Sequence, residues 1–187
     1  MLGSFSDLKV NMFDNIKAVV FDLDGTLYNF KGLPLRLMWA LPTDFSRIAN
    51  DRSIRKKLKG CDFGTPEAYK EEYAKRMAKK TALKPADALN WYSNRYIGTM
   101  CFLLKKYYSA RPQLTEVFQM LHSKGIKIAV FSDYPRVKQR VRALDFSDEA
   151  MESISGIYSA EDFGSQKPAL RPFMEIAQQL GVTPESC

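Results

Sequence analysis

The sequence predicts an α/β protein: a parallel sheet with helices, into which a long all-helical segment is inserted. Three observations support this class. An apolar run at residues 18–21 ends in two acids and a glycine, as a buried strand does at the edge of a parallel sheet. A second apolar run at residues 126–131 follows a helical pattern, so a right-handed crossover would place it beside the first. Residues 31–108, between the two runs, are helical in pattern.

Composition limits the kinds of protein that this chain can be. Its 187 residues, 45% of them hydrophobic, suffice for one full domain or for a compact domain with an insertion. No apolar stretch approaches the length of a membrane span, and residues 1–15 contain no apolar signal core. Cys61, Cys101 and Cys187 lack metal-ligand spacing and fit a reducing compartment. We therefore expect a cytoplasmic protein without a membrane anchor, and we assign no function to residues 1–16.

The positive charge is concentrated in the middle of the chain. The formal net charge is +7, and residues 31–108 hold 17 Lys and Arg against 7 Asp and Glu. A basic region of this kind could attract anionic substrates, bind nucleic acid, or consist of solvated helix faces. The basic cluster at residues 55–59 lacks the interleaved aromatic side chains of a single-strand binding surface. We therefore do not expect nucleic acid as a partner.

The first apolar run predicts the element that carries the chemistry. Residues 18–21 show no alternation, as in a strand that is buried on both faces. Asp22 and Asp24 follow, and Gly25 permits a sharp turn. The two acids then lie at the carboxyl edge of the sheet, where open α/β folds bind their ligands. One carboxylate could attack an electrophile while the other moves a proton, and both could bind Mg²⁺; the alternative is that they cap the next turn.

The insertion is predicted to be a small helical bundle. Gly32 and Pro34 mark a turn that leaves the sheet, and Pro42 interrupts an apolar segment that supplies the first helix. Thr65 and Pro66 form a helix start, and Pro85 begins another helix. The residues that share the apolar helix faces, and that we assign to the core, are Tyr69, Tyr73, Met77, Leu89, Tyr92, Tyr96, Met100, Leu103 and Tyr107.

After the insertion the pattern returns to helix and strand. Residues 114–121 carry apolar side chains at i, i+3, i+4 and i+7, and Gly125 stands where a left-handed helix cap belongs. The second strand follows at residues 126–131. His122, the only histidine, lies in the last turn of this helix, where a cation suits the helix dipole. Because no carboxylate or cysteine is near it in the sequence, we expect no catalytic role for His122.

Ser132 and Asp133 come directly after the second strand. A helix follows in which Val137, Val141 and Leu144 share a face. The two polar residues could cap that helix, and a hydroxyl with free backbone N–H groups at a helix start could also hold phosphate oxygens. Both interpretations need the same geometry, and both stay open.

The last part of the chain contains a short third strand, predicted at residues 156–158, and a helix with Gly181 at its end. Lys167 stands just before Pro168 in the loop between them. A lone lysine in a loop is usually solvated surface, so its position alone predicts no function.

The string DLDGT at residues 22–26, after an apolar strand, resembles the first motif of the haloacid dehalogenase superfamily of phosphohydrolases. Ser132 at the end of the second strand and Lys167 before a proline are similar to its second and third motifs. The resemblance implies a Rossmann-like core in which Asp22 is the nucleophile that takes up the phosphoryl group. It implies that Asp24 protonates the leaving group and activates water. Dehalogenating members lack the second acid, so the chain looks like a phosphatase or phosphomutase.

The same resemblance implies the ligands of the site. Ser132, Asp133 and Lys167 would bind the substrate phosphate, and Lys167 would also act in catalysis by neutralising the nucleophile. Asp22 and Asp24 would contribute oxygens to Mg²⁺, the implied cofactor. The substrate would be a small phosphorylated metabolite.

The resemblance also implies a domain organisation. Residues 1–30 and 109–187 would form a discontinuous core, and residues 31–108 a helical cap that closes over the site and selects the substrate. After residues 181–187 the family would continue into a fourth strand that ends in one or two acids, and this sequence has none of it, so C-terminal strands of the core would be absent. We therefore expect a truncated chain, an incomplete Mg²⁺ shell and an unpaired edge on the first strand.

The acids at positions 161 and 162 are the nearest substitutes for the missing ones. Glu161 and Asp162 follow the third strand, and the second strand separates that strand from the first. Two strand spacings amount to roughly 10 Å, so we do not expect these acids to reach Asp22.

These observations leave three functions open. The leading hypothesis is a Mg²⁺-dependent phosphohydrolase that acts on a small phosphomonoester through an aspartyl-phosphate. A phosphomutase would use the same residues. The third is a catalytically dead module that binds a phosphate compound or a protein partner, and the missing fourth motif favours it. The sequence does not predict an oligomeric state.

Overall fold

The computed structural model describes residues 15–187, with a three-stranded parallel sheet in the order β1-β2-β3. The strands are β1 (Ala18–Phe21), β2 (Lys127–Ser132) and β3 (Ile154–Ser159). The sequence predicted all three with bounds that differ by no more than one or two residues, so the α/β class is confirmed. The segment to which we assign no function lies, up to residue 14, outside the described residues.

Parallel pairing brings the carboxyl ends of the strands to one edge of the sheet. Phe21 pairs with Val130, and Ser132 pairs with Ser159. The residues that follow β1 therefore lie beside the end of β2. This edge is where the sequence places the candidate site.

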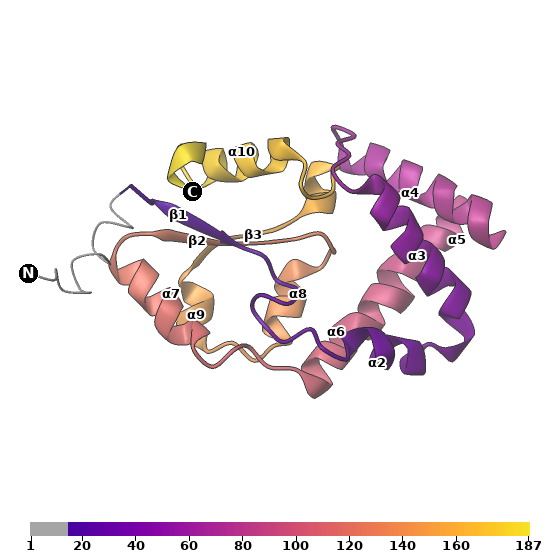
Figure 1. Cartoon of the computed structure of the whole chain (residues 1–187), viewed down its shortest axis with the longest axis horizontal. Helices are drawn as coiled ribbons and strands as arrows, with labels where there is room; N and C mark the ends of the chain where they lie inside the picture. Colours follow the sequence, from indigo (N-terminus) through magenta and orange to yellow (C-terminus); the bar gives the residue numbers. More distant parts are fainter. Residues whose placement is uncertain (1–14) are drawn as a thin grey trace, which may run out of the picture.

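Helices cover both faces of the sheet (Figure 1). Helix α10 (Leu170–Gln179) lies on one face, and its Ile176 packs in a cluster with residues of β1 and β2. The other face carries α7 (Leu114–Ser123), α8 (Val137–Arg142) and α9 (Asp148–Glu152). Each of these helices turns apolar side chains toward the strands.

Strand β2 is the buried centre of the sheet, whereas β1 forms its edge. All residues of β2 after Lys127 are buried, but in β1 only Ala18 is, and the other three are half-buried. The prediction that the first strand is buried on both faces is therefore wrong for most of its length. The reason is that β1 has β2 as its single strand neighbour within residues 15–187, which agrees with the expected unpaired edge.

The connection from β1 to α7 is helical and stands beside the sheet, at the right of Figure 1. An insertion built of helices is therefore confirmed, while the domain division after residues 30 and 108 remains a prediction. The segments of this insertion are α2 (Leu33–Ala40), a 3₁₀ turn (Pro42–Asp44), α3 (Phe45–Leu58), α4 (Pro66–Thr81), α5 (Pro85–Asn90), a π-helix (Trp91–Tyr96) and α6 (Ile97–Tyr107).

The predicted core residues of the insertion are buried, except Leu89, which is half-buried, and Tyr107. Thr65 caps α4, where its Oγ accepts a hydrogen bond of 3.2 Å from the Ala68 N–H, and the predicted face of α4 is buried. The stripe that ends at Tyr107 runs through the π-helix, and its members Met100 and Leu103 beyond that helix are buried. Tyr107 is 45% exposed, with Arg36 4.0 Å over its ring, so its assignment to the core is wrong.

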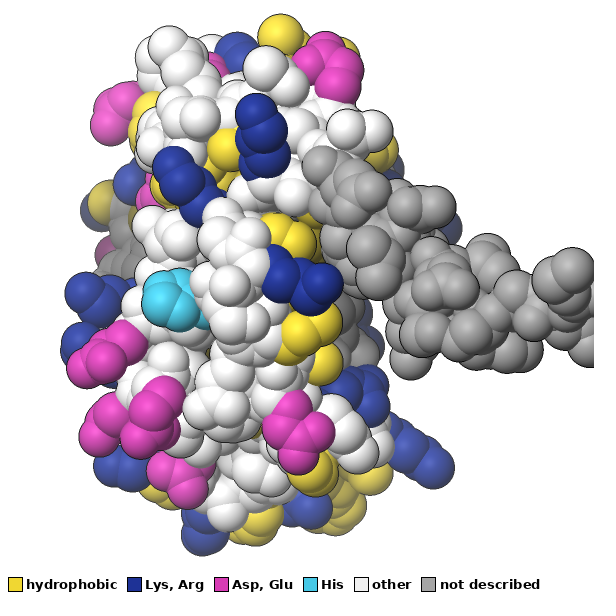
Figure 2. All heavy atoms as spheres, turned by 90° about the vertical axis from the view of Figure 1, so that its left-hand side faces the viewer, with side chains coloured by type: hydrophobic (Ala, Val, Ile, Leu, Met, Phe, Trp, Pro, Cys, Tyr) yellow, Lys and Arg dark blue, Asp and Glu magenta, His cyan; other side chains and the backbone are white. Residues whose placement is uncertain are grey.

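The face of the molecule opposite the insertion carries charges of both signs, interspersed (Figure 2). His122 is exposed on this face, in the last turn of α7. It joins no ion pair in the described part of the chain, and its lack of a catalytic role stays a prediction. None of the helices between residues 15 and 187 combines the length and the apolar character that crossing a bilayer requires.

Candidate active site

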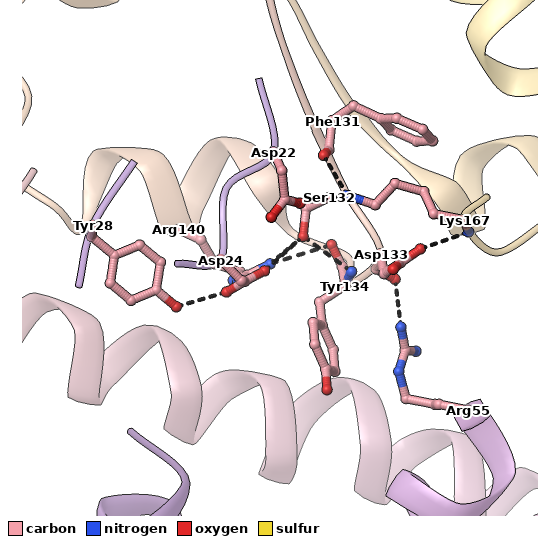
Figure 3. A network of polar contacts seen from close by, with 10 residues as sticks. All are labelled: Asp22, Asp24, Tyr28, Arg55, Phe131, Ser132, Asp133, Tyr134, Arg140 and Lys167. Atoms are coloured by element: carbon pink, nitrogen blue, oxygen red, sulfur yellow. Dashed lines mark hydrogen bonds and ion pairs between the residues drawn. The ribbon is translucent and has the colours of Figure 1, made fainter. Parts of the chain in front are cut away.

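The predicted site residues meet at the carboxyl edge of the sheet (Figure 3). Asp22 and Asp24 lie in the turn after β1, Ser132 ends β2, and Asp133 follows it. Lys167, from the loop after β3, extends to the same place. The structure therefore brings together all five residues that the sequence singled out.

Asp22 and Lys167 form the open half of this network. The Lys167 Nζ donates to Asp22 Oδ1 and, at 3.1 Å, to the Phe131 carbonyl at the end of β2. The Asp22 side chain is 40% exposed and that of Lys167 19%. A carboxylate and an ammonium therefore lie in contact, and the carboxylate remains accessible from solvent.

Asp24 forms the closed half, because its carboxylate accepts from three donors. Oδ1 accepts from the guanidinium of Arg140 and, at 2.6 Å, from the Tyr28 hydroxyl. Oδ2 accepts from the Ser132 hydroxyl at 2.9 Å. Arg140 projects from α8 and is fully buried, whereas the Asp24 side chain is 16% exposed. The two acids, which are only two positions apart, thus have opposite surroundings.

The surroundings of Asp24 determine its protonation state. Burial raises the pKa of Asp24, but the charge of Arg140 and the hydrogen bonds from Arg140, Tyr28 and Ser132 outweigh burial and bring that pKa below its usual value. Burial and the charge of Asp24 both raise the pKa of Tyr28, so its hydroxyl stays protonated and remains a donor. Asp24 is therefore ionised near neutral pH.

Ser132 lies inside the network and not at its surface. The residue is fully buried, and its Oγ accepts from the Arg140 guanidinium at 3.0 Å and from the Tyr134 N–H at 3.2 Å while donating to Asp24. The interpretation that Ser132 and Asp133 cap the next helix is wrong. Helix α8 begins at Val137, after a left-handed residue that makes no side-chain cap.

Asp133 holds the loop that carries Lys167. Its Oδ1 accepts from the Lys167 backbone N–H at 2.8 Å. Its carbonyl accepts at 2.9 Å from Arg55, which belongs to α3 of the insertion. The predicted phosphate contact of Asp133 remains a prediction, and the geometry gives its carboxylate a positioning role.

Arg55, Tyr28 and Arg140 are the members of the network that sequence reasoning missed. A signal existed for both arginines: Arg140 falls on the same helix face as Val137, Val141 and Leu144, and Arg55 lies between Ile54 and Leu58 on the buried face of α3. A buried arginine needs an acid or several acceptors as partners. Arg55 donates to the hydroxyls of Tyr69 and Tyr92 at 3.3 and 3.0 Å, and Arg140 Nε is buried with no hydrogen-bond partner among residues 15–187.

Of the two predicted Mg²⁺ ligands, Asp22 and Asp24, only Asp22 has a carboxylate that is free to bind the ion. Asp22 is accessible and has one charged partner, so its carboxylate suits a hard cation. The Asp24 carboxylate is committed to Arg140 and two hydroxyls, so it does not suit one. Among residues 15–187 no group of three His, Cys, Asp or Glu side chains could hold a metal ion.

Glu161 and Asp162 take part in other interactions. Glu161 forms an ion pair of 3.5 Å with Lys70 of α4, and Asp162 accepts from the Ser159 N–H at 3.0 Å in a capping box. These partners lie outside the Asp22 network, in agreement with the expectation that the two acids do not replace missing ligands.

Comparison with known proteins identifies the family of this arrangement. The model of the haloacid dehalogenase-like hydrolases matches residues 16–187, almost the whole chain.

Individual relatives are more distant. The phosphoglycolate phosphatase of Salmonella typhi is 25% identical over 189 residues, which cover 94% of this chain and 73% of that protein. The crystal structure of CbbY from Rhodobacter sphaeroides with xylulose-(1,5)bisphosphate is similar with a TM-score of 0.61 at 21% identity, covering 91% of this chain and 75% of that one. A putative beta-phosphoglucomutase from Thermotoga maritima is similar with a TM-score of 0.52 at 19% identity, covering 91% and 73%. The two structures are evidence for the fold alone.

The first prediction concerns the buried ion pair. Arg140→Met should lower the free energy of unfolding by about 3–5 kcal/mol, because it leaves Asp24 in a buried place without its counter-charge. Arg142→Met is the matched control, since Arg142 is exposed on the same helix, and should change stability by less than about 0.5 kcal/mol. Urea unfolding at pH 7 measures both. Equal effects of the two substitutions would contradict the structural role of Arg140.

The second prediction follows from the lowered pKa of Asp24. Because that pKa is lower in the folded than in the unfolded chain, the ionised carboxylate stabilises the fold above the unfolded value of about 3.9. This contribution is lost as the pH falls through the folded pKa. In urea unfolding between pH 2 and 7, the stability difference between wild type and Asp24→Asn should be constant above about pH 5 and shrink below about pH 4. A difference that does not shrink in acid would disprove it.

Proposed function

The chain belongs to the haloacid dehalogenase-like hydrolases, and we propose that it is a phosphatase that hydrolyses a small phosphomonoester with Asp22 as nucleophile. One observation carries this proposal: the Asp22 carboxylate, 40% exposed at the open edge of the sheet, is paired with the Lys167 ammonium. An accessible carboxylate can attack phosphorus while an adjacent cation stabilises the charge on the transferred oxygens.

The reaction would take place in two steps. In the first, an Asp22 oxygen bonds to phosphorus as the bond from phosphorus to the leaving oxygen breaks, which yields an aspartyl-phosphate and an alkoxide or phenoxide that takes a proton from water. In the second, a water oxygen attacks the same phosphorus, its proton passes to a base, and phosphate leaves Asp22. Lys167 lies where it would stabilise negative charge in both steps.

Asp24 suits the base of the second step better than the acid of the first. With its pKa lowered and three donors on its carboxylate, Asp24 has no proton to give to a leaving group near neutral pH. This differs from the sequence-based hypothesis, in which the same residue also protonates the leaving oxygen. The leaving oxygen would therefore take its proton from water, which makes turnover depend on the pKa of the leaving group.

Mg²⁺ is the cofactor that family membership implies. The Asp22 carboxylate would hold it, because it is accessible and has one charged partner. Asp24 would not, because Arg140 and two hydroxyls already occupy its oxygens. When bound, the ion would offset the negative charge of the phosphoryl oxygens.

The relatives support a small phosphorylated metabolite as the substrate. The name of one relative indicates activity on phosphoglycolate, and the CbbY structure contains xylulose-(1,5)bisphosphate. Both compounds are small, and both are phosphomonoesters. We extend only this common class to the present chain, together with the cytoplasmic location expected from its sequence.

Two alternatives to a phosphatase remain, a phosphomutase and a catalytically inactive binding module. A phosphomutase would use the same residues, and product analysis, free phosphate against an isomerised ester, separates it from a phosphatase. A catalytically inactive binding module is favoured by the burial of Ser132 and by the donors that enclose Asp24, because neither side chain is free to meet a ligand in this arrangement. Calorimetry that finds a bound phosphate ester without turnover in excess Mg²⁺ would support this module.

The third prediction tests the nucleophile. Asp22→Asn should abolish hydrolysis of 4-nitrophenyl phosphate, because an amide oxygen cannot form the aspartyl-phosphate. Asp87→Asn removes the same charge from an exposed position of α5 and should leave turnover unchanged. Phosphate release measured with Mg²⁺ present tests both variants. Unchanged turnover by Asp22→Asn would exclude this residue as nucleophile.

The fourth prediction tests the role of Asp24 as a base only. Phenyl phosphate should be hydrolysed about 10²-fold more slowly than 4-nitrophenyl phosphate, the size of the contribution that a general acid usually makes for poor leaving groups. The values of kcat/KM for a series of substituted phenyl phosphates measure this dependence on leaving-group pKa. Equal rates across the series would mean that Asp24, or another group, protonates the leaving oxygen.

A further inference from the structure

A hollow of about 310 Å³ lies between helix α3 of the insertion and the loops of the candidate site. Four cationic side chains line it from the α3 side, namely Arg52, Arg55, Lys56 and Lys59. Their spacing of i, i+3, i+4 and i+7 puts them on one face of the helix. The opposite wall consists of Asp133, Tyr134 and Gln166. Arg52, Lys56 and Lys59 are exposed, whereas Arg55 is buried, so three accessible cations face a wall that contains one carboxylate.

None of these four cations has an acidic partner within residues 15–187, unlike several other basic residues of the insertion. Arg47 and Arg95 both pair with Asp44, and Arg76 pairs with Glu72. In the described part of the chain, no ion pair within 4.0 Å joins any of the four cations of the hollow to an acid. Unpaired charges that converge on a concave surface attract anions.

The hollow is adjacent in the chain to the groups that meet Asp22. Gln166 lines it and precedes Lys167, and Asp133 and Tyr134 line it directly after Ser132. Neighbouring residues are about 3.8 Å apart, so the hollow lies beside the backbone that carries Ser132 and Lys167. Arg55, Asp133 and Lys167 are drawn together in Figure 3, linked by the hydrogen bonds through Asp133.

The wall also contains a buried polar group without a partner. Gln166 is 6% exposed, and its Oε1 is buried with no hydrogen bond in residues 15–187. An unsatisfied buried amide is costly unless a ligand or water completes it. This oxygen needs a hydrogen-bond donor, such as a water molecule or a hydroxyl group of a ligand, and it is not itself a contact for an anion.

The aromatic residue of the hollow does not favour nucleic acid. The guanidinium of Arg55 lies 4.1 Å from the ring centre of Tyr134, and that of Arg140 lies 5.6 Å from it. A ring engaged by two cations is not a free platform for a base, as single-strand binding requires.

We propose that this hollow binds a second anionic group, a carboxylate or a phosphate, of the same small phosphomonoester that delivers its phosphoryl group to Asp22. The proposal rests on the function proposed above and adds the substrate class: the molecule carries negative charge at both ends. Lys56 and Lys59 are its specificity-determining residues, because both are exposed and no other role in the fold occupies them.

The test compares three compounds of similar size: phosphoglycolate, ethylene glycol bisphosphate and hydroxyethyl phosphate, which lacks the second anion. Wild type should prefer the first two. The double variant Lys56→Gln/Lys59→Gln should raise the KM for these two roughly tenfold, while kcat and the KM for hydroxyethyl phosphate stay nearly unchanged. The ratio between phosphoglycolate and the bisphosphate tells a carboxylate subsite from a phosphate subsite.

The matched control is Lys57→Gln/Lys80→Gln. It removes the same charge from the insertion, but these lysines line a different hollow, on the other side of α3. It should change the KM for none of the compounds. An equal effect of the two double variants, or no preference of wild type for the dianionic compounds, would overturn the subsite.

Binding measurements separate this proposal from the proposed function. If wild type hydrolyses none of the three compounds, the phosphatase fails, and calorimetric titration of phosphoglycolate against hydroxyethyl phosphate still tests the hollow. Tighter binding of phosphoglycolate that is lost in Lys56→Gln/Lys59→Gln supports the subsite. If those lysines affect the binding of a short single-stranded oligonucleotide and not that of phosphoglycolate, the surface is a nucleic-acid site and the subsite is wrong.

Discussion

The buried ion pair between Asp24 and Arg140 is the interaction on which the rest of the site depends. Its partners lie 116 positions apart in the chain, one in the turn after β1 and the other on α8. Such a pair is stable only where other groups satisfy the remaining polar atoms. Tyr28 and Ser132 complete the carboxylate, and Ser132 and the Tyr134 carbonyl accept from the guanidinium. One network thus joins the turn after β1, the end of β2 and helix α8.

The ion pair with Arg140 also makes Asp24 chemically different from Asp22, although both acids lie in one short turn. Gly25, at a φ of +87°, continues the turn in a left-handed conformation that few other residues adopt easily. Asp22 remains at the open edge beside a single lysine, whereas Asp24 is enclosed by an arginine and two hydroxyls. An accessible, singly paired carboxylate suits nucleophilic attack, whereas an enclosed carboxylate with a lowered pKa stays ionised and is a poor proton donor. The assignment of roles therefore follows from the surroundings and not from the order of the residues in the motif.

The sequence predicted the elements that depend on local patterns and missed those that depend on distant partners. Apolar runs and their polar ends located the three strands, so the convergence of Asp22, Ser132 and Lys167 followed from parallel pairing. The helix face of Tyr69 and the cap at Thr65 are also local. Arg140 was missed because its burial depends on an acid more than a hundred residues away. Tyr107, the last residue of α6, continues the apolar spacing but is exposed, because packing against other elements and not periodicity decides its burial.

Helix α3 uses its cations in two ways, and the difference connects the insertion to the chemistry. Arg55 points inward, where the hydroxyls of Tyr69 and Tyr92 and the carbonyl of Asp133 accept its donors. The Asp133 carboxylate in turn holds the backbone of Lys167, whose side chain reaches Asp22. A displacement of α3 would therefore be transmitted through two hydrogen bonds to the cation beside the nucleophile. Because the outward cations of the same helix line the hollow, an anion bound there would act on the element that positions Lys167.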